Sequence, residues 1–586
     1  MAAMSISQQQ ELTINLEAMP FSRQGSYLAL GQPPYFMDIE PGLYFRTLRG
    51  GNFDLPRREV FRIQLVTDGE VLGDVSMVAS PAVLTMEHEK GSASFCWSDL
   101  DTLRVRGAGV GVRLVKATTG SYDFVYGFGG ERCFINASTQ RMNYRVEALS
   151  GHLHIMSVWE EVKSTDIVLE LAPDKQTGEL SFEIEEFAST WSGPKPYRSF
   201  EECVLEAKQE YESWLEQVYT GIERDSMSTE GVAMAAYVNG SGIVRPSGLL
   251  KRPAMLMSKN HMTNVWSWDH CFNAIALAPH DIKLAWDQFM LPFDHQEGVG
   301  MLPDLINDGF ALPNFTKPPI HGWALSKLWE LAPDFVEEQL PGLYGPLCQW
   351  TRWWLTYRDE GGLGLPYYIH GNDSGWDNAT IFRLGGPVRS PDLAAFLSVQ
   401  METLERIARK IGLQEEAEQW AEQRKLLVTR MLDQFWKDGK FTALHVETGE
   451  TVEADSLILY LPLILGEALP DEVIHILTKD LSQEGRYLTD YGLATERVDS
   501  PRYRSDGYWR GPIWAPSTLL VIEGLDRSGK KELAREVARR FCRMVEKTGM
   551  AENFDAMTGR GLRDLAYTWT SSVYLILLRQ YGAVLK

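Results

Sequence analysis

Residues 390–408 read SPDLAAFLSVQMETLERIA, and the pattern of this stretch decides the predicted fold. Ser390 is a typical helix N-cap, and Pro391 suits the first helical position because no N–H is needed there. The apolar residues that follow recur at the spacing of one helix face. These residues are Leu393, Phe396, Leu397, Met401, Leu404 and Ala408. The stretch therefore predicts an amphipathic helix that buries one side.

The same pattern extends from about residue 227 to the C-terminus. We count about twelve helical segments over some 360 residues, separated by loops rich in Gly, Pro and Asp. Six helical hairpins that close into a ring form an (α/α)6 barrel, which is the predicted fold of this region. A helical solenoid is the alternative, but no sequence repeat of fixed period supports it.

Residues 10–195 have a different pattern, in which short alternating runs such as 103–106 and 110–115 are bounded by Gly, Asp and Asn. Many short strands with turn signals predict an antiparallel β-sandwich. A helix should begin at Ser199, because Ser199 and Glu202 form a capping box. We therefore predict a β-sandwich domain over 1–197, a linker helix over 198–226 and a helical domain over 227–586.

Composition and charge exclude several classes of partner. The chain has 586 residues and a net charge of −22, whereas nucleic acids and anionic membranes require basic patches. No apolar run is long enough to span a bilayer, and the N-terminus lacks the basic and apolar regions of a secretory signal. The six cysteines show neither metal-ligand spacing nor a disulfide framework. We expect a cytoplasmic protein that binds neither nucleic acid nor membranes, and the sequence leaves the oligomeric state open.

Residues 370–378 read HGNDSGWDN, a loop with two carboxylates and an indole. An aromatic face can stack on a sugar ring. It can also desolvate a neighbouring carboxyl, which then keeps its proton near neutral pH. Residues 551–555, AENFD, supply a second carboxylate in another loop. Two loop carboxylates of this kind are typical of sugar chemistry.

Five motifs occur in the order found in a known family and cover roughly residues 230–586. They are WSWDHCFNA (266–274), TKPP (316–319), SGWDN (374–378), YWRGPIW (508–514), and ENF (552–554) followed by TG (558–559). The chain resembles glycoside hydrolase family 63 and its relatives in the clan of glucoamylase and trehalase. The resemblance implies a mainly α fold with β, in which an (α/α)6 barrel catalytic domain follows an antiparallel β-sandwich domain. It also implies an O-glycosyl hydrolase that acts on a small carbohydrate.

The resemblance implies that Asp377 is the general acid and Glu552 the general base. Considered without it, Asp377 is a turn residue and Glu552 a surface carboxylate. Asp373 is interpreted as structural, and Asp555 is the alternative to Glu552. Two carboxylates without a separate nucleophile suit hydrolysis with inversion, in which the acid protonates the leaving oxygen and the base activates a water.

Several residues of these motifs are candidate substrate contacts. The resemblance assigns Asp269 to the hydroxyls of the non-reducing sugar, and a carboxylate can accept two hydrogen bonds from neighbouring hydroxyls. Arg510 could donate paired hydrogen bonds to a carboxylate or to sugar oxygens, and Trp514 could form the floor of the sugar subsite. A helix cap, a salt bridge and a core indole are the respective structural alternatives. The full set is Trp266, Asp269, Lys317, Trp376, Tyr508, Arg510 and Trp514.

The favoured function is that of an inverting α-glycosidase acting on a small α-glucoside or oligosaccharide. Hydrolysis of mannosylglycerate or glucosylglycerate is the nearest alternative, because relatives in the family do this. A sugar isomerase or epimerase on the same barrel, with His270 and His370 moving protons, belongs to another class, and an inactive sugar-binding protein is a third possibility. No histidine pair has zinc-ligand spacing, so neither a catalytic metal nor a cofactor is predicted.

Overall fold

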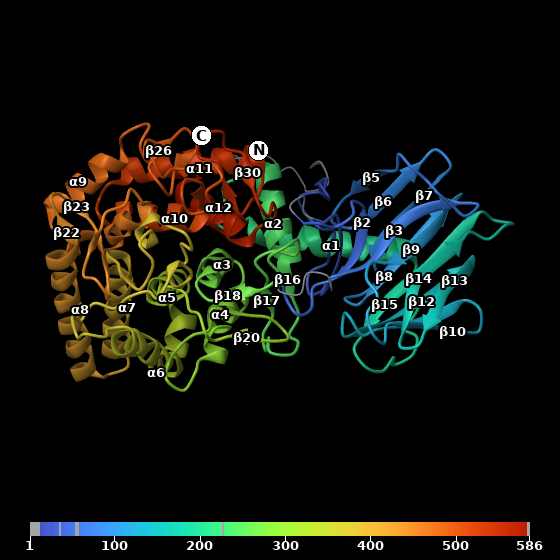
Figure 1. The fold of residues 1–586 in the computed structure, drawn as a ribbon, viewed down its shortest axis with the longest axis horizontal. Coiled ribbons are helices and arrows are strands. Elements are labelled where there is room, and N and C mark those ends of the chain that lie inside the picture. The colour runs from blue at the N-terminus through green and yellow to red at the C-terminus, as the bar shows by residue number, and fades with distance from the viewer. Residues whose placement is uncertain (1–11, 34–36, 53–57, 225–227, 583–586) are drawn as a thin grey trace. The chain divides into compact units, whose positions relative to one another are not determined.

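The computed structural model describes residues 12–33, 37–52, 58–224 and 228–582 (Figure 1). These residues form a mixed α/β protein with helices and antiparallel sheets. They divide into two compact units. The N-terminal unit contains the described residues of 1–217, 236–245 and 258–263, and the C-terminal unit contains those of 218–235, 246–257 and 264–586.

Two antiparallel sheets make up most of the N-terminal unit. The first has the order β1-β2-β3-β9-β14-β13, with β4 beside β3, and the second has the order β10-β11-β12-β15-β8-β7-β6-β5. The strands of the first sheet are β1 (Leu28–Gly31), β2 (Leu43–Thr47), β3 (Glu59–Thr67), β4 (Glu70–Val71), β9 (Gly111–Lys116), β13 (His152–Glu160) and β14 (Lys163–Ala172). The strands of the second are β5 (Ser76–Ala79), β6 (Leu84–His88), β7 (Gly91–Trp97), β8 (Thr102–Ala108), β10 (Phe124–Phe128), β11 (Arg132–Ala137), β12 (Met142–Ser150) and β15 (Glu179–Phe187).

Aromatic side chains join the inner faces of the two sheets. Tyr144 on β12 meets Phe45 on β2 and Phe61 on β3 edge-on, with ring centroids 5.9 and 5.7 Å apart. All three rings are buried. Edge-to-face contact is a favourable arrangement of aromatic rings, so these residues form a shared core between the sheets.

Helix α1 (Phe200–Val218) begins as predicted. The backbone N–H of Glu202 donates to the Ser199 hydroxyl at 3.2 Å, and the backbone N–H of Ser199 donates to the Glu202 carboxylate at 2.6 Å. This reciprocal pair is the predicted capping box. Helix α2 (Thr229–Gly242) and strand β16 (Ile243–Val244) follow.

Helices dominate the C-terminal unit. The α-helices are α3 (Asp269–Leu277), α4 (Ile282–Met290), α5 (His321–Leu331), α6 (Pro333–Tyr357), α7 (Pro391–Lys410), α8 (Gln414–Phe435), α9 (Asp471–Leu481), α10 (Ala515–Arg527), α11 (Lys531–Thr548) and α12 (Thr568–Tyr581). In the described part of this unit, four 3-10 helices accompany them: η3 (Phe293–His295), η4 (Gly371–Ser374), η5 (Thr380–Phe382) and η6 (Leu457–Ala468). No helix within the described ranges is long and apolar enough to cross a membrane.

Short strands connect these helices. They are β17 (Ala254–Met255), β18 (Val265–Trp266), β19 (Leu305–Ile306), β20 (Ala311–Leu312), β21 (Val388–Arg389), β22 (Trp436–Lys437), β23 (Lys440–Phe441), β24 (Ala443–His445), β25 (Thr451–Val452), β26 (Leu488–Thr489), β27 (Gly492–Leu493), β28 (Ile513–Trp514), β29 (Asn553–Phe554) and β30 (Gly561–Leu562). The sheets β18-β19-β20 and β28-β29-β30 carry motif residues, so they bear directly on the candidate site.

Helix α7 confirms the prediction made from residues 390–408, and it lies beside α8 (Figure 1). All six residues of the predicted apolar face are buried. Ser390 occupies the N-cap position, but its side chain does not cap the helix. Its hydroxyl donates instead to the Asp392 carboxylate, so this cap satisfies a side chain rather than a backbone N–H.

Helix α5 approaches α7 closely through Gly322. The Gly322 N–H donates to the Gln400 side-chain oxygen at 3.1 Å, and the Thr403 hydroxyl donates to the Gly322 carbonyl at 2.9 Å. A Cβ atom at Gly322 would collide with the Cα atom of Gln400. The two helix backbones can lie this close only because residue 322 has no side chain.

We predict that Gly322→Ala lowers the apparent Tm, because overpacking of a tight contact typically costs about 1–3 kcal/mol. The matched control is Gly342→Ala in α6, where an added Cβ meets no atom within 4 Å. Ala is the better helix former by roughly 0.5–1 kcal/mol, so the control should hold or raise the apparent Tm. Thermal unfolding followed by circular dichroism measures both. An apparent Tm for Gly322→Ala at or above that of Gly342→Ala would contradict the close approach.

Candidate active site

A three-stranded sheet brings two motif loops together. Strand β28 pairs with β29, so that Trp514 lies opposite Asn553, and β29 pairs with β30. Glu552 directly precedes Asn553. Its backbone N–H donates to the Asp564 carbonyl at 2.7 Å, and its carbonyl accepts from the Trp569 indole at 3.2 Å. Glu552 is therefore held on a strand edge beside the loop of residues 508–514.

A second small sheet places two more carboxylates. Trp266 on β18 lies opposite Leu305 on β19, and this pairing carries Asp304 toward the start of α3, where Asp269 is the first residue. Burial raises the pKa of Asp269 to about 8, while Lys317 lowers it and Asp304 raises it. Within the described residues, the Oδ2 atom of Asp269 has no hydrogen-bond partner. A buried oxygen of this kind suits a ligand that brings a hydroxyl donor.

The HGNDSGWDN loop folds back on itself. Gly375 adopts a left-handed conformation with φ of 73°, and a Cβ atom there would lie 2.6 Å from the Trp268 ring. A Cβ at Gly371 would collide with the Asp377 carbonyl. Asp373 is buried inside the turn, where it accepts from Arg358 at 2.7 Å and from the Ile369 N–H at 3.0 Å. These contacts give Asp373 a structural role, as the sequence analysis interpreted it.

Asn378 joins this loop to the YWRGPIW loop. Its side-chain amide donates to the Gly507 carbonyl at 3.0 Å, and its side-chain oxygen accepts from the Trp509 N–H at 2.9 Å. Trp376 lies against Trp509, with ring centroids 4.6 Å apart. The loop that carries Asp377 is therefore fixed to the loop that carries Tyr508.

The motif indoles form a buried layer. Trp509 stacks on Trp514 with centroids 4.0 Å apart and planes 7° apart. Trp376 is 1% exposed and Trp514 is 0% exposed, so neither ring offers a free face to a ligand as it stands. Trp266 is 9% exposed.

Lys317 is the cation of the site. Its ammonium donates to the Asn372 side-chain oxygen at 2.6 Å and lies 3.1 Å from the Asp304 carboxylate. Burial alone would lower the pKa of Lys317, but Asp304, Asp377 and Asp269 together raise it. The ammonium thus stays charged and compensates the carboxylates around it.

Asp377 is in contact with solvent, yet protein surrounds it closely enough to limit its hydration. This loss of bulk water raises the pKa of Asp377; Lys317 lowers it, Asp304 raises it, and His370 lowers it. Loss of hydration disfavours the charged form of a carboxyl.

Glu552 is only 4% exposed. Burial raises the pKa of Glu552 to about 8, with Asp564 adding to the rise while Arg563 and a hydrogen bond from Tyr508 lower it. Tyr508 has a left-handed backbone with φ of 61°, and the Arg563 guanidinium lies 4.9 Å from its ring centroid. Burial and then Glu552 and Asp377 raise the pKa of the Tyr508 phenol. The phenol therefore lies within electrostatic reach of both carboxyls.

The Arg510 guanidinium donates to the Arg502 carbonyl at 3.2 Å, and the described residues include no carboxylate paired with it. Its contact with sugar oxygens stays a prediction. Asp304, Asn378 and Arg563 were missed by the sequence analysis. Asn378 stood in a quoted motif, but its partners lie about 130 residues away, and Asp304 and Arg563 stood outside every motif. No group of three or more His, Cys, Asp or Glu side chains in the described ranges could hold a metal ion.

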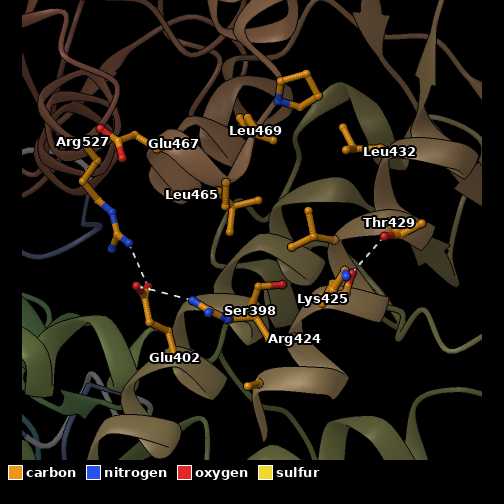
Figure 2. Close-up of a pocket in the computed structure, with 14 residues that line it drawn as sticks. Ser398, Glu402, Arg424, Lys425, Thr429, Leu432, Leu465, Glu467, Leu469 and Arg527 are labelled. Atoms are coloured by element: carbon orange, nitrogen blue, oxygen red, sulfur yellow. Dashed lines mark hydrogen bonds and ion pairs between the residues drawn. The ribbon is translucent and has the colours of Figure 1, made fainter. Parts of the chain in front are cut away.

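A cavity of about 860 Å³ lies elsewhere in the C-terminal unit (Figure 2). Glu402 in its wall pairs with Arg527 at 2.8 Å and with Arg424 at 3.5 Å, so these charges satisfy one another. Arg527 is the last residue of α10. The YWRGPIW loop leads into the first residue of the same helix, so the cavity and this loop lie at opposite ends of α10. We assign no chemistry to this cavity.

Comparison with known proteins defines the class of enzyme. The model of the family described as mannosylglycerate hydrolase MGH1-like glycoside hydrolase domain matches residues 262–570, just over half of the chain. The protein is an O-glycosyl hydrolase. More particularly, the chain belongs to this MGH1-like family, which confirms the resemblance to glycoside hydrolase family 63.

Relatives are found among both sequences and structures. Mannosylglycerate hydrolase MGH1 of Selaginella moellendorffii is 24% identical over 53% of this chain and 80% of its own length. Glucosylglycerate hydrolase of Mycolicibacterium hassiacum is 24% identical over 56% of this chain and 97% of its own. The glucose complex of the family 63 mannosylglycerate hydrolase from Thermus thermophilus covers 58% of this chain and 98% of that one, with a TM-score of 0.52 and 21% identity. The structure of a bacterial glucoamylase complexed with acarbose covers 98% of this chain and 95% of its own, with a TM-score of 0.59 and 12% identity.

Proposed function

We propose that the protein hydrolyses glucosylglycerate or mannosylglycerate with inversion, using Asp377 as general acid and Glu552 as general base. The observation that carries this proposal is the placement of both carboxyls within electrostatic reach of the one Tyr508 phenol. Relatives named as hydrolases of these two compounds support the choice of substrate. These relatives do not favour the small α-glucoside that the sequence suggested as substrate, so a small α-glucoside becomes the second candidate.

The architecture proposed for this function is an (α/α)6 barrel over 227–586, preceded by a β-sandwich over 1–197 and a linker helix over 198–226. The likeness to glucoamylase, which extends over 98% of the chain, supports both parts. The paired helices of the C-terminal unit and the aromatic core shared by the two sheets agree with it. A cytoplasmic location stays part of the same proposal.

The acid must hold a proton and the base must lose one. Limited hydration raises the pKa of Asp377, as an acid requires. Glu552, with a pKa of about 8, is a strong base once ionised. Positive charge that develops on the sugar ring favours the ionised form of Glu552, because the buried carboxylate lies in a medium of low polarity.

Other motif residues have proposed roles in this scheme. Asp269, with its unpartnered buried oxygen, would accept from sugar hydroxyls, and Lys317 would compensate the charge around it. Tyr508 would position Glu552. Because the rings of Trp376 and Trp514 are buried, we propose that they support the loops instead of stacking on the sugar. Trp266 and Arg510 would line the outer part of the site.

The leaving group of these substrates carries a carboxylate, and it must lie on the Asp377 side of the bond. His370 is a half-buried side chain there that lowers the pKa of Asp377, as Lys317 does, and Lys317 already compensates Asp304. We therefore propose that the His370 imidazole receives the glycerate carboxylate. A proton-transfer role with His270, as in an isomerase, is not favoured, because burial lowers the pKa of His270 to about 4.

Asp377→Asn and Glu552→Gln should each lower hydrolysis of glucosylglycerate or mannosylglycerate by about 10²–10⁴-fold, the usual contribution of a general acid or base. For the wild type and both variants, the rate of hexose release from the glycerate glycosides is compared with the rate of release from maltose, kojibiose and trehalose. Thermal unfolding controls for the fold. A variant that keeps more than about a tenth of the wild-type rate would remove its residue from the proposed role. A wild type that cleaves only the disaccharides would make the α-glucoside the substrate.

The hexose released first from an α-linked substrate should be the β-anomer. Single displacement brings water to the face opposite the leaving group, so the anomeric centre inverts. Proton NMR spectra recorded within minutes of adding enzyme separate the two anomeric signals before mutarotation mixes them. Early appearance of the α-anomer would require a covalent intermediate and would refute the two-carboxylate inversion.

His370→Gln and Arg563→Gln should separate recognition from ionisation. His370→Gln removes the imidazole from the proposed glycerate subsite, so kcat/KM should fall for the glycerate glycosides more than for a disaccharide. Arg563 lowers the pKa of Glu552, so its removal should raise that pKa above about 8 and move the limb that reports Glu552 to higher pH.

The Arg563→Gln shift should be the same for every substrate and should leave the preference between substrates unchanged. Arg560→Gln, which changes an exposed arginine of the same segment, is the control. It should change neither the position of the pH limb nor the preference between substrates. The pH profiles of kcat/KM for both substrate types measure this. An equal loss on both types from His370→Gln would rule out carboxylate recognition by His370.

A further inference from the structure

Strand β13 is an open edge of the first sheet. It is nine residues long, and among the described strands it pairs only with β14. Its sequence, HLHIMSVWE, contains neither Pro nor Lys. Natural sheets protect their edges with such residues or with short edge strands, because an open edge offers unpaired N–H and C=O groups to another strand. Strand β13 has neither of these protections, although its pairing with β14 is irregular between Ser157 and Trp159 and its Leu153 N–H donates to the Glu131 carboxylate at 3.0 Å.

Apolar side chains are exposed on both faces of β13. Ile155 is 39% exposed, Met156 44%, Val158 58% and Trp159 49%. A strand that had only to cover its own sheet would bury one face. Contiguous exposed apolar side chains mark surfaces that meet a partner.

Strand β10, at the end of the second sheet, extends the same surface. Phe124, Tyr126 and Phe128 alternate along it and are 38%, 41% and 64% exposed. Phe124 meets Trp159 edge-on with ring centroids 5.1 Å apart. A Cβ atom at Gly127 would lie 3.1 Å from the Ile155 side chain, so the two edge strands are in close contact. We call these residues of β10 and β13 the β13 edge surface.

We propose that the β13 edge surface is the contact between two copies of this chain, in which β13 pairs antiparallel with β13 of the second copy, centred on Met156. In this register Met156 lies opposite Met156, and Leu153 lies opposite Trp159. His152, which contacts Glu131 of its own chain at 3.2 Å, lies opposite Glu160 of the second copy at both ends of the ribbon, where an imidazole N–H can donate to a carboxylate. A parallel arrangement would place Glu160 beside Glu160.

Two features favour a second copy over another occupant. The exposed side chains of β13 include Ile155, Met156 and Val158, which offer a sugar no hydrogen bond, so the surface suits a protein better than a glycan. The pattern of β13 is self-complementary about Met156, with histidine at one end and glutamate at the other, and a contact about a two-fold axis requires this of a single strand.

The test is a charge exchange at the centre of the contact. Sedimentation velocity of the full-length wild type over a wide concentration range should show the mass of two chains. Met156→Lys alone and Met156→Glu alone should each sediment as one chain, because two like charges then meet at the axis. An equimolar mixture of the two variants should regain the mass of two chains, since an ammonium from one variant then lies opposite a carboxylate from the other.

The matched control is Val78→Lys on β5, the strand that ends the second sheet on the side away from β10, where Val78 is 55% exposed. This variant should keep the mass of two chains. A wild type that sediments as one chain at every concentration overturns the proposal, as does a dimer that survives Met156→Lys or a mixture that fails to associate.

A glycan partner would give a different result. The wild type would then sediment as one chain but migrate more slowly in native gels that contain soluble glucan, and Trp159→Ala would abolish the retardation. That outcome would also overturn the contact between copies. Hydrolysis by all of these variants should match the wild type, because none of the changed residues lies in the candidate active site.

Discussion

The Lys317 ammonium is the interaction on which the candidate site depends. Three carboxylates, those of Asp269, Asp304 and Asp377, lie near enough to raise its pKa. Carboxylates gathered in a region with little water repel one another and are each costly to ionise. One buried cation among them lowers that cost, and its hydrogen bond to Asn372 ties it to the HGNDSGWDN loop. One charge thus links the HGNDSGWDN loop to the carboxylates of Asp269 and Asp304.

The tryptophans of the motifs pack on one another and fix a loop of the candidate site. Trp376 precedes Asp377, but its ring turns into the layer formed with Trp509 and Trp514, while the carboxyl reaches solvent. Neighbouring residues in a tight turn point in different directions, so sequence adjacency alone does not decide what each one contacts. The indole layer and Asn378 together fix the loop, which gives the carboxyl a defined position without taking part in the chemistry.

Local sequence patterns predicted the local elements well. The helix of residues 390–408, the capping box at Ser199 and the strands of the first domain follow from periodicity and cap chemistry, which act within a few residues. Contacts of long range had no such signal. The hydrogen bonds of Asn378 cross about 130 residues, and Arg563 reaches Tyr508 from a segment with no recognisable motif. The five motifs located the candidate site only because their order resembles that of a known family. Site residues that lie between the motifs could not be predicted from the sequence.

The pKa values of the two proposed catalytic carboxyls are raised by the same physical effect, but different neighbouring groups oppose the rise. Loss of hydration raises the pKa of each, so this effect alone does not make one carboxyl the acid and the other the base. Asp377 has Lys317 and His370 as its cations, whereas Glu552 has Arg563 and the Tyr508 hydroxyl, opposed by Asp564. Since Tyr508 is within reach of both carboxyls, a change of charge at one is felt at the other. Under the proposed mechanism, a ring that becomes positive acts as one more cation near Glu552. It favours ionised Glu552 at the moment when water must be activated. The site then binds the charged transition state better than the neutral sugar, and this difference is what accelerates a reaction.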